Sequence, residues 1–134
     1  FCGETEQDHI DTLTLMEEVV FDSAFMFAYS ERPGTLASRK YPDDIPYELK
    51  TQRLNEIIAL QGRMSLKSNE KEVGKRLKVL VEGPSKKNAE ELCGRASSNK
   101  MCVFPSRGEK AGDYCEVEVV SVTSATLLCK RIDQ

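Results

Sequence analysis

Residues 77–113 read LKVLVEGPSKKNAEELCGRASSNKMCVFPSRGEKAGD. Hydrophobic and polar side chains alternate at the start of this stretch, with Leu77, Val79 and Val81 on one side and Lys78, Leu80 and Glu82 on the other. A period of two residues is typical of a β-strand with one buried face. Gly83 and Pro84 come next, and this pair predicts that the strand ends there in a turn.

Similar short patterns continue to the end of the chain, separated by residues that favour turns. The expected strands are residues 75–83, 91–97, 100–105, 114–123 and 126–131. Five short strands over this length predict a small five-stranded OB-like β-barrel.

The charge of the chain is unevenly distributed. The 134 residues have a net charge of −3 and a hydrophobic fraction of 40%, which is enough for a packed core. Residues 1–62 hold 5 basic and 12 acidic side chains, whereas residues 63–110 hold 12 basic and 6 acidic ones. A basic segment in an acidic chain favours a polyanionic partner for that segment. A solvated lysine-rich surface is the alternative interpretation, and charge alone leaves both open.

OB-like barrels bind single-stranded nucleic acid with a basic groove and stacked aromatic rings. Candidates for contacts with nucleic-acid phosphates are Lys86, Lys87, Arg95, Lys100 and Arg107. Aromatic candidates for stacking are Phe104 and Tyr114. Phe104 could equally fill the core of the barrel.

The N-terminal part has a different pattern. Thr5 and Asp8 have the spacing of a capping box, so a loop followed by a helix is expected within residues 1–20. Residues 21–29 are hydrophobic on both faces, which is typical of a strand inside a parallel sheet that helices cover. A helix followed by such a strand indicates an α/β fold. The loop 30–35 then lies where α/β folds place their chemistry, although a simple Pro-Gly turn is the alternative.

A polar connector over residues 36–46 precedes a long helix that is expected to run from Pro46 to about Asn69. His9 is the only histidine, and without neighbouring ligand residues it is expected to be structural. The five cysteines include no CxxC pair, so no zinc or redox motif is expected. No secretory signal pattern is present, so reduced thiols in the cytoplasm are expected. Those expected to be buried in the core are Cys102, Cys115 and Cys129. No hydrophobic run is long enough to cross a bilayer, so no membrane partner is expected.

Several motifs together resemble one family of enzymes. The segments are FCGETEQDH (1–9), FMFAYSERPGTLAS (25–38), LVEGPSKK (80–87), LCGR (92–95), VFP (103–105) and GDYCEVEV (112–119). In this order they resemble the end of the radical-SAM tRNA methylthiotransferases, which close with a TRAM domain. The resemblance is nearest to those that modify isopentenyladenosine beside the anticodon. Cys2 and His9 depart from the usual family pattern, which has proline and phenylalanine there.

The resemblance implies an α+β chain with two parts. Residues 1–66 would be the end of the radical-SAM partial TIM barrel with a linking helix, and residues 67–134 the TRAM domain. The parent enzyme would use S-adenosylmethionine and two 4Fe-4S clusters to add a methylthio group to N6-isopentenyladenosine in tRNA. The cluster motif CxxxCxxC is absent from these residues, so no cofactor and no catalysis are expected of them alone.

The resemblance also assigns residues. Gly3 and Glu4 would lie near the cofactor face of the barrel. The substrate-facing loop would carry Tyr29, Ser30, Arg32 and Gly34. The anticodon stem-loop of tRNA would bind the TRAM domain through Lys86, Lys87, Arg95, Lys100, Phe104 and Arg107.

Three other interpretations fit the sequence less well. A free-standing RNA-binding barrel needs neither the loop 30–35 nor the doubly hydrophobic strand. The uneven charge argues against a protein-interaction scaffold, and no orienting carboxylate can be assigned for a cysteine-dependent hydrolase. The chain is expected to be a piece of a longer protein. Residues 1–45 hold too little structure to bury segment 21–29, so this part is expected to self-associate or to pack poorly.

Overall fold

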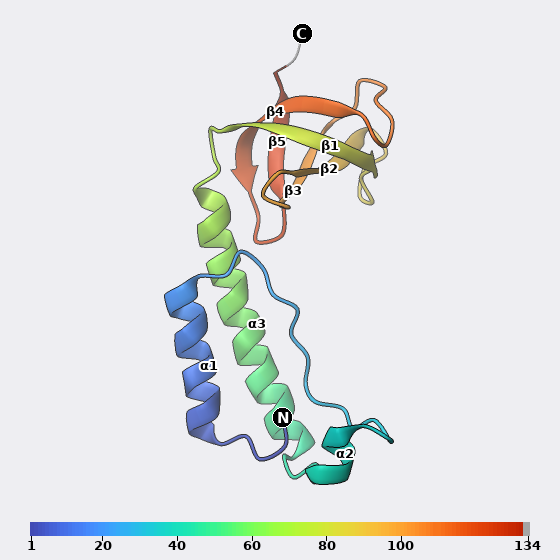
Figure 1. The fold of residues 1–134 in the computed structure, drawn as a ribbon. Coiled ribbons are helices and arrows are strands. Elements are labelled where there is room, and N and C mark those ends of the chain that lie inside the picture. Colours follow the sequence, from blue (N-terminus) through green and yellow to red (C-terminus); the bar gives the residue numbers. More distant parts are fainter. Residues whose placement is uncertain (133–134) are drawn as a thin grey trace. The chain divides into compact units, whose positions relative to one another are not determined.

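The computed structural model describes residues 1–132, and the chain divides into two compact units, residues 1–64 and residues 65 onward. The helices are α1 (Glu6–Val19), α2 (Leu36–Lys40) and α3 (Tyr47–Glu70) (Figure 1). The strands are β1 (Arg76–Pro84), β2 (Glu91–Ala96), β3 (Met101–Pro105), β4 (Tyr114–Val122) and β5 (Leu127–Arg131). Among residues 1–132, no helix combines the length and the hydrophobicity needed to cross a bilayer.

The five strands form a closed barrel in the order β1-β2-β3-β5-β4, with β4 pairing back onto β1. Strands β3 and β5 pair in parallel, and the other neighbours are antiparallel. The prediction of a small five-stranded barrel is therefore confirmed. Closure matters physically because it leaves no strand edge with unpaired backbone groups.

The inner faces of the five strands fill the barrel. The core consists of Val79, Val81, Leu92, Ala96, Cys102, Phe104, Cys115, Val117, Val119, Leu127 and Cys129. The alternation predicted from Val79 and Val81 is confirmed, and so is the burial of the three core cysteines. Gly94 on β2 allows β1 to come close, because a Cβ atom there would lie 2.3 Å from the carbonyl oxygen of Leu80.

The first helix begins at the predicted capping box. Thr5 Oγ1 accepts a hydrogen bond from the Asp8 backbone N–H, and the Asp8 carboxylate accepts one from the Thr5 backbone N–H. His9 is buried, and its Nε2 lies 2.6 Å from Glu56 Oε2 on α3. This contact between two helices is the structural role expected of the only histidine.

The long helix also follows the prediction, since α3 begins directly after Pro46 and runs through Gly62 without a break. The short helix α2 was not predicted. Thr35 Oγ1 accepts a hydrogen bond from the Ser38 N–H and so caps α2. The sequence signal was a threonine N-cap before five residues that can form a helix, and the nearby prolines obscured it.

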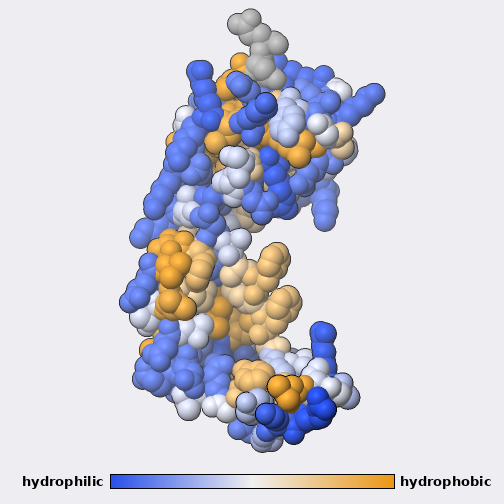
Figure 2. All heavy atoms as spheres, in the orientation of Figure 1, coloured by the Kyte–Doolittle hydropathy of each residue, from blue (hydrophilic) through white to orange (hydrophobic). Residues whose placement is uncertain are grey.

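The prediction of a buried strand over residues 21–29 is wrong for this structure. The segment forms no strand, and the Phe25 and Phe27 side chains are 95% and 85% exposed. Figure 2 shows hydrophobic surface where Figure 1 draws this segment. The physical reason is that a strand needs a partner for its backbone, and the described residues of the N-terminal unit contain no strand.

Candidate functional site

Two neighbouring loops gather basic side chains at one end of the barrel. Lys86 and Lys87 lie in the loop between β1 and β2, while Arg107 and Lys110 lie in the loop between β3 and β4. The two loops are joined by a backbone hydrogen bond of 2.9 Å from the Ser106 N–H to the Glu90 carbonyl. We call the four basic residues Lys86, Lys87, Arg107 and Lys110 the basic loop end.

An ion pair anchors one of these loops to the barrel. The Glu109 carboxylate accepts a hydrogen bond of 2.8 Å from the Arg107 backbone N–H and pairs with the guanidinium of Arg131 on β5. The Arg107 N–H foremost, with a smaller contribution from Arg131, holds the pKa of Glu109 below its usual value. The ion pair with Arg131 compensates the charge of Glu109 within this loop.

The structure separates the other two predicted cations from the basic loop end. Arg95 lies on the outer wall of β2, where its Nε is 3.0 Å from a Glu82 carboxylate oxygen and its Nη1 donates to Asn99. Lys100 lies at the opposite end of the barrel, where its Nζ donates to Ser68 Oγ at 2.9 Å. These internal contacts occupy donors that phosphates would otherwise use, so Arg95 and Lys100 are weaker candidates than Lys86 and Lys87.

The assignment of Phe104 as an RNA-stacking residue is corrected by its position. Its side chain is 1% exposed and belongs to the barrel core, with the Arg131 guanidinium 5.8 Å from the ring centroid. A base cannot reach a ring that is enclosed in this way. The alternative role, filling the core, is the one that the structure supports.

Tyr114 is the aromatic residue on the barrel that faces outward. It begins β4 and is 62% exposed, and the Nζ atom of Lys78 lies 4.8 Å from its ring centroid. The role of Lys78 beside this ring was missed. The alternation that places Lys78 on the outer side of β1 was a usable signal, but the pairing of β1 with β4 was needed to bring the two residues together.

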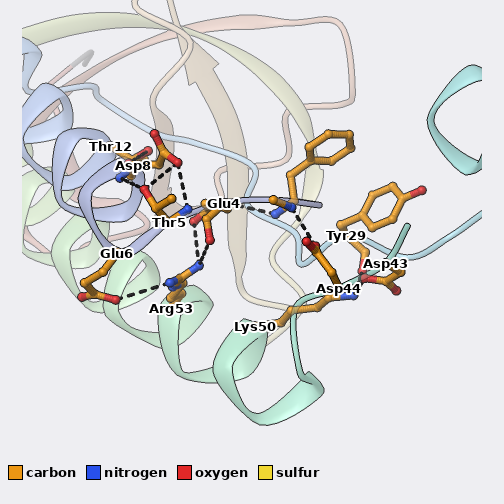
Figure 3. Close-up of polar contacts among 12 residues, drawn as sticks. Glu4, Thr5, Glu6, Asp8, Thr12, Tyr29, Asp43, Asp44, Lys50 and Arg53 are labelled. Atoms are coloured by element: carbon orange, nitrogen blue, oxygen red, sulfur yellow. Dashed lines mark hydrogen bonds and ion pairs between the residues drawn. The ribbon is translucent and has the colours of Figure 1, made fainter. Parts of the chain in front are cut away.

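In the N-terminal unit, α3 organises the segment predicted to lie near a cofactor. The backbone N–H of Gly3 donates to an Asp44 carboxylate oxygen at 2.7 Å, and Gly3 has a φ of 69°. The carbonyl of Glu4 accepts a hydrogen bond of 2.9 Å from Arg53, whose guanidinium also reaches Glu6 (Figure 3). Arg53 is 8% exposed, and its hydrogen bond to the Glu4 carbonyl holds the turn before α1 against α3.

The predicted substrate-facing residues divide into two groups. Tyr29 is partly buried: Lys50 Nζ lies 5.5 Å from its ring centroid, donates to its carbonyl and pairs with Asp43 (Figure 3). Burial raises the pKa of the Tyr29 hydroxyl. Tyr29 and Glu4 both line a small pocket of about 60 Å³, together with Lys50 and Arg53.

The remaining residues of that loop lie on the surface. Ser30, Arg32 and Gly34 are exposed and are not part of the pocket wall. The Arg32 carbonyl accepts hydrogen bonds from the backbone and side chain of Thr35, and Gly34 has a φ of 84°. The backbone of this loop is therefore a turn that leads into α2.

The described residues offer no ligand set for a metal or a cluster. Within residues 1–132, no three histidine, cysteine, aspartate or glutamate side chains gather where they could hold a metal ion. Cys102, Cys115 and Cys129 face the hydrophobic core of the barrel. The arrangement of these thiols does not fit an iron–sulfur cluster.

Comparisons with known proteins found one family model and several similar enzymes. The family model described as TRAM domain matches residues 70–130. The chain is 53% identical over 127 residues to a tRNA-2-methylthio-N(6)-dimethylallyladenosine synthase of Phocaeicola vulgatus, covering 95% of this chain and 28% of the relative. The enzymes with the same name from Amoebophilus asiaticus and Porphyromonas gingivalis are 53% and 52% identical, over 96% and 95% of this chain and 26% and 28% of their own length.

Among solved structures, the apo form of Mycoplasma genitalium RNase R aligns with 63% of this chain and 18% of its own, at 10% identity. Its TM-score of 0.35 is too low to inform the fold. The sequence relationship is much stronger, although the chain spans only about 28% of the length of the first relative. Over at least 95% of its own length, the chain is therefore similar to tRNA-2-methylthio-N(6)-dimethylallyladenosine synthases, and its residues 70–130 match the TRAM domain.

Proposed function

We propose that the barrel of this chain holds tRNA for a radical-SAM methylthiotransferase. The observation that carries the proposal is the basic loop end, two adjoining loops with four basic side chains on a TRAM barrel. Lysine and arginine at such a position bind phosphates and position an RNA without reading its sequence. The finer assignment, to the anticodon stem-loop, follows from the names of the relatives and from the family.

The reaction proposed for the whole enzyme is the addition of a methylthio group to N6-isopentenyladenosine beside the anticodon, in the cytoplasm. S-adenosylmethionine and the 4Fe-4S clusters would supply the radical and sulfur-transfer chemistry when bound. The described residues do not hold ligands for the clusters, so we expect these 134 residues alone to bind RNA without catalysing the reaction.

The N-terminal unit would contribute to that enzyme by positioning. Glu4 and Tyr29 line one pocket of about 60 Å³, which is too small for a cofactor, so we propose that they shape the wall of a site that the whole enzyme completes. Arg32 is exposed, and its rigid guanidinium suits bidentate binding of a phosphate or carboxylate. Gly3, Ser30 and Gly34 would shape the backbone around these side chains.

The proposal is tested by reversing charge at the basic loop end. The double variant Lys86→Glu/Lys87→Glu should weaken binding of tRNA and of an anticodon stem-loop, measured by fluorescence polarisation over a salt series. We expect at least a tenfold loss, and the slope of log affinity against log salt should become shallower by about one to two units.

The matched control is Lys67→Glu/Lys71→Glu, which makes the same charge change on exposed lysines elsewhere in the barrel unit. This control should bind nearly as the unmodified chain does. Equal losses from both double variants would show that only net charge matters, and unchanged binding by the first would remove the assignment of the basic loop end.

A further inference from the structure

The outer wall of the barrel carries an exposed aromatic residue directly beside the basic loop end. Tyr114 follows the loop that holds Arg107 and Lys110. A hydrogen bond of 2.9 Å from the Val81 N–H to the Asp113 carbonyl attaches this junction to β1. Because Asp113 precedes Tyr114 in the chain, the position of the ring is tied to the same strands that carry the basic loops.

The surroundings of Tyr114 leave much of this residue exposed. Lys78 Nζ lies 4.8 Å from the ring centroid, and Leu80 is the residue directly opposite Tyr114 in the strand pair. Tyr114 is nevertheless 62% exposed, so much of the residue remains accessible to a ligand. Leu80 is itself 37% exposed and adds hydrophobic surface next to the ring.

Tyr114 has little part in the packing of the barrel. The core is filled from the inner faces of the strands, and on β4 Cys115, Val117 and Val119 supply that contribution. An outward tyrosine with most of its area in water contributes little to folding. A cation on one face and solvent on the other are the conditions under which a ring can receive a flat, π-bonded ligand.

We propose that Tyr114, backed by Lys78, stacks on one unpaired base of the RNA that the basic loop end holds. This inference rests on the proposed RNA-binding function and adds the class of RNA. Stacking on an aromatic side chain contributes roughly fivefold to hundredfold in affinity per base. A base inside a duplex is already stacked on both faces, so the contribution applies to RNA with an unpaired nucleotide.

The experiment uses the 134-residue chain and two RNA probes. One probe is a short single strand that carries the fluorescent base analogue 2-aminopurine, and the other is a blunt duplex of the same strand. The variants are Tyr114→Leu, Tyr114→Phe and, as a matched control, Tyr47→Leu, which changes an exposed tyrosine of α3. Affinity and quenching of the analogue are measured for each.

For the single strand, Tyr114→Leu should reduce affinity about tenfold and remove most of the quenching, because the aromatic face is lost. Tyr114→Phe should keep both, since its ring stacks as well. Affinity for the duplex should be nearly unchanged by either variant, and Tyr47→Leu should behave as the unmodified chain. Amide hydrogen exchange of the barrel checks that each variant is folded.

Other outcomes would overturn the inference. If Tyr114→Leu binds the single strand with unchanged affinity and quenching, the stacking role is wrong, while salt-dependent binding lost in Lys86→Glu/Lys87→Glu would leave the proposed function in place. Equal losses for single strand and duplex would mean that Tyr114 acts on the fold or on a phosphate. Failure of the unmodified chain to bind either RNA at low salt would overturn both proposals.

Discussion

The two units of this chain differ in how far they bury phenylalanine side chains. Phe104 on β3 is 1% exposed inside the barrel, whereas Phe25 in the N-terminal unit is 95% exposed. Both lie in hydrophobic stretches whose pattern predicts a strand. The barrel contains every strand partner that β3 requires, and the described N-terminal unit contains none for Phe25. A hydrophobic pattern therefore leads to burial only where the chain also supplies the rest of the sheet.

The units also differ in what holds them together. The barrel has a continuous hydrophobic core, while in the N-terminal unit three conspicuous contacts between segments are polar. They are made by Lys50, Arg53 and the His9–Glu56 pair. Polar clamps position a segment precisely but contribute only modest net free energy each. Substitutions in each unit can test this contrast between a hydrophobic core and polar contacts.

The largest effect is expected from removing the buried ring. Phe104→Ala should lower the free energy of unfolding of the barrel by about 3–5 kcal/mol, because it leaves a cavity in the core. Phe25→Ala should change stability by less than about 0.5 kcal/mol and should reduce any self-association of the chain. Amide hydrogen exchange by mass spectrometry reports each unit separately, and sedimentation reports association. Comparable destabilisation by both variants would contradict the contrast between a buried Phe104 and an exposed Phe25.

Gly94 should be the next most sensitive position. Gly94→Ala places a Cβ atom 2.3 Å from the Leu80 carbonyl oxygen and 2.7 Å from Val79 Cγ1, so β1 and β2 must separate. We expect a loss of about 3 kcal/mol in barrel stability, the upper end of ordinary overpacking. Gly62→Ala is the control, because open space surrounds that helical position and alanine favours helix. A tolerated Gly94→Ala would show that the barrel is more plastic than its packing indicates.

Arg53 should matter only to the N-terminal unit. Arg53→Met removes the donor to the Glu4 carbonyl and the ion pair with Glu6, and we expect a loss of about 1–2 kcal/mol there. Arg63→Met, at an exposed position of the same helix, should have almost no effect. Faster hydrogen exchange in residues 1–20 with unchanged exchange in the barrel is the expected result. Unchanged exchange in both would show that the clamp is dispensable.

The smallest expected effect is on the pH dependence of barrel stability. The folded barrel holds the pKa of Glu109 below its usual value, so the unfolded chain binds this proton more readily. The stabilisation is therefore present above the ordinary glutamate pKa of about 4.3 and is lost as pH falls through the lower folded value. Glu109→Gln should flatten the pH dependence of barrel stability in that range. Parallel pH profiles for the variant and the unmodified chain would contradict the assignment.

Local patterns were sufficient for much of the fold. The capping box at Thr5 and Asp8, the helix after Pro46 and the five barrel strands all follow from propensity and period. The residues of the candidate RNA interface could be predicted only in part from these local patterns. Lys86, Lys87 and Arg107 were identifiable as basic, but their separation from Arg95 and Lys100 depends on which strand ends lie at the same end of the barrel.

The sequence by itself determined the capping box of α1, the start of α3, the five barrel strands and the inward alternation of β1. Those properties depend on neighbours within a few residues. Only the tertiary structure decided that Phe104 fills the core, that Lys78 lies beside Tyr114, and that residues 21–29 stay exposed. The reason is physical: these outcomes depend on strand pairing between distant segments, and a local pattern cannot reveal whether a partner strand is present.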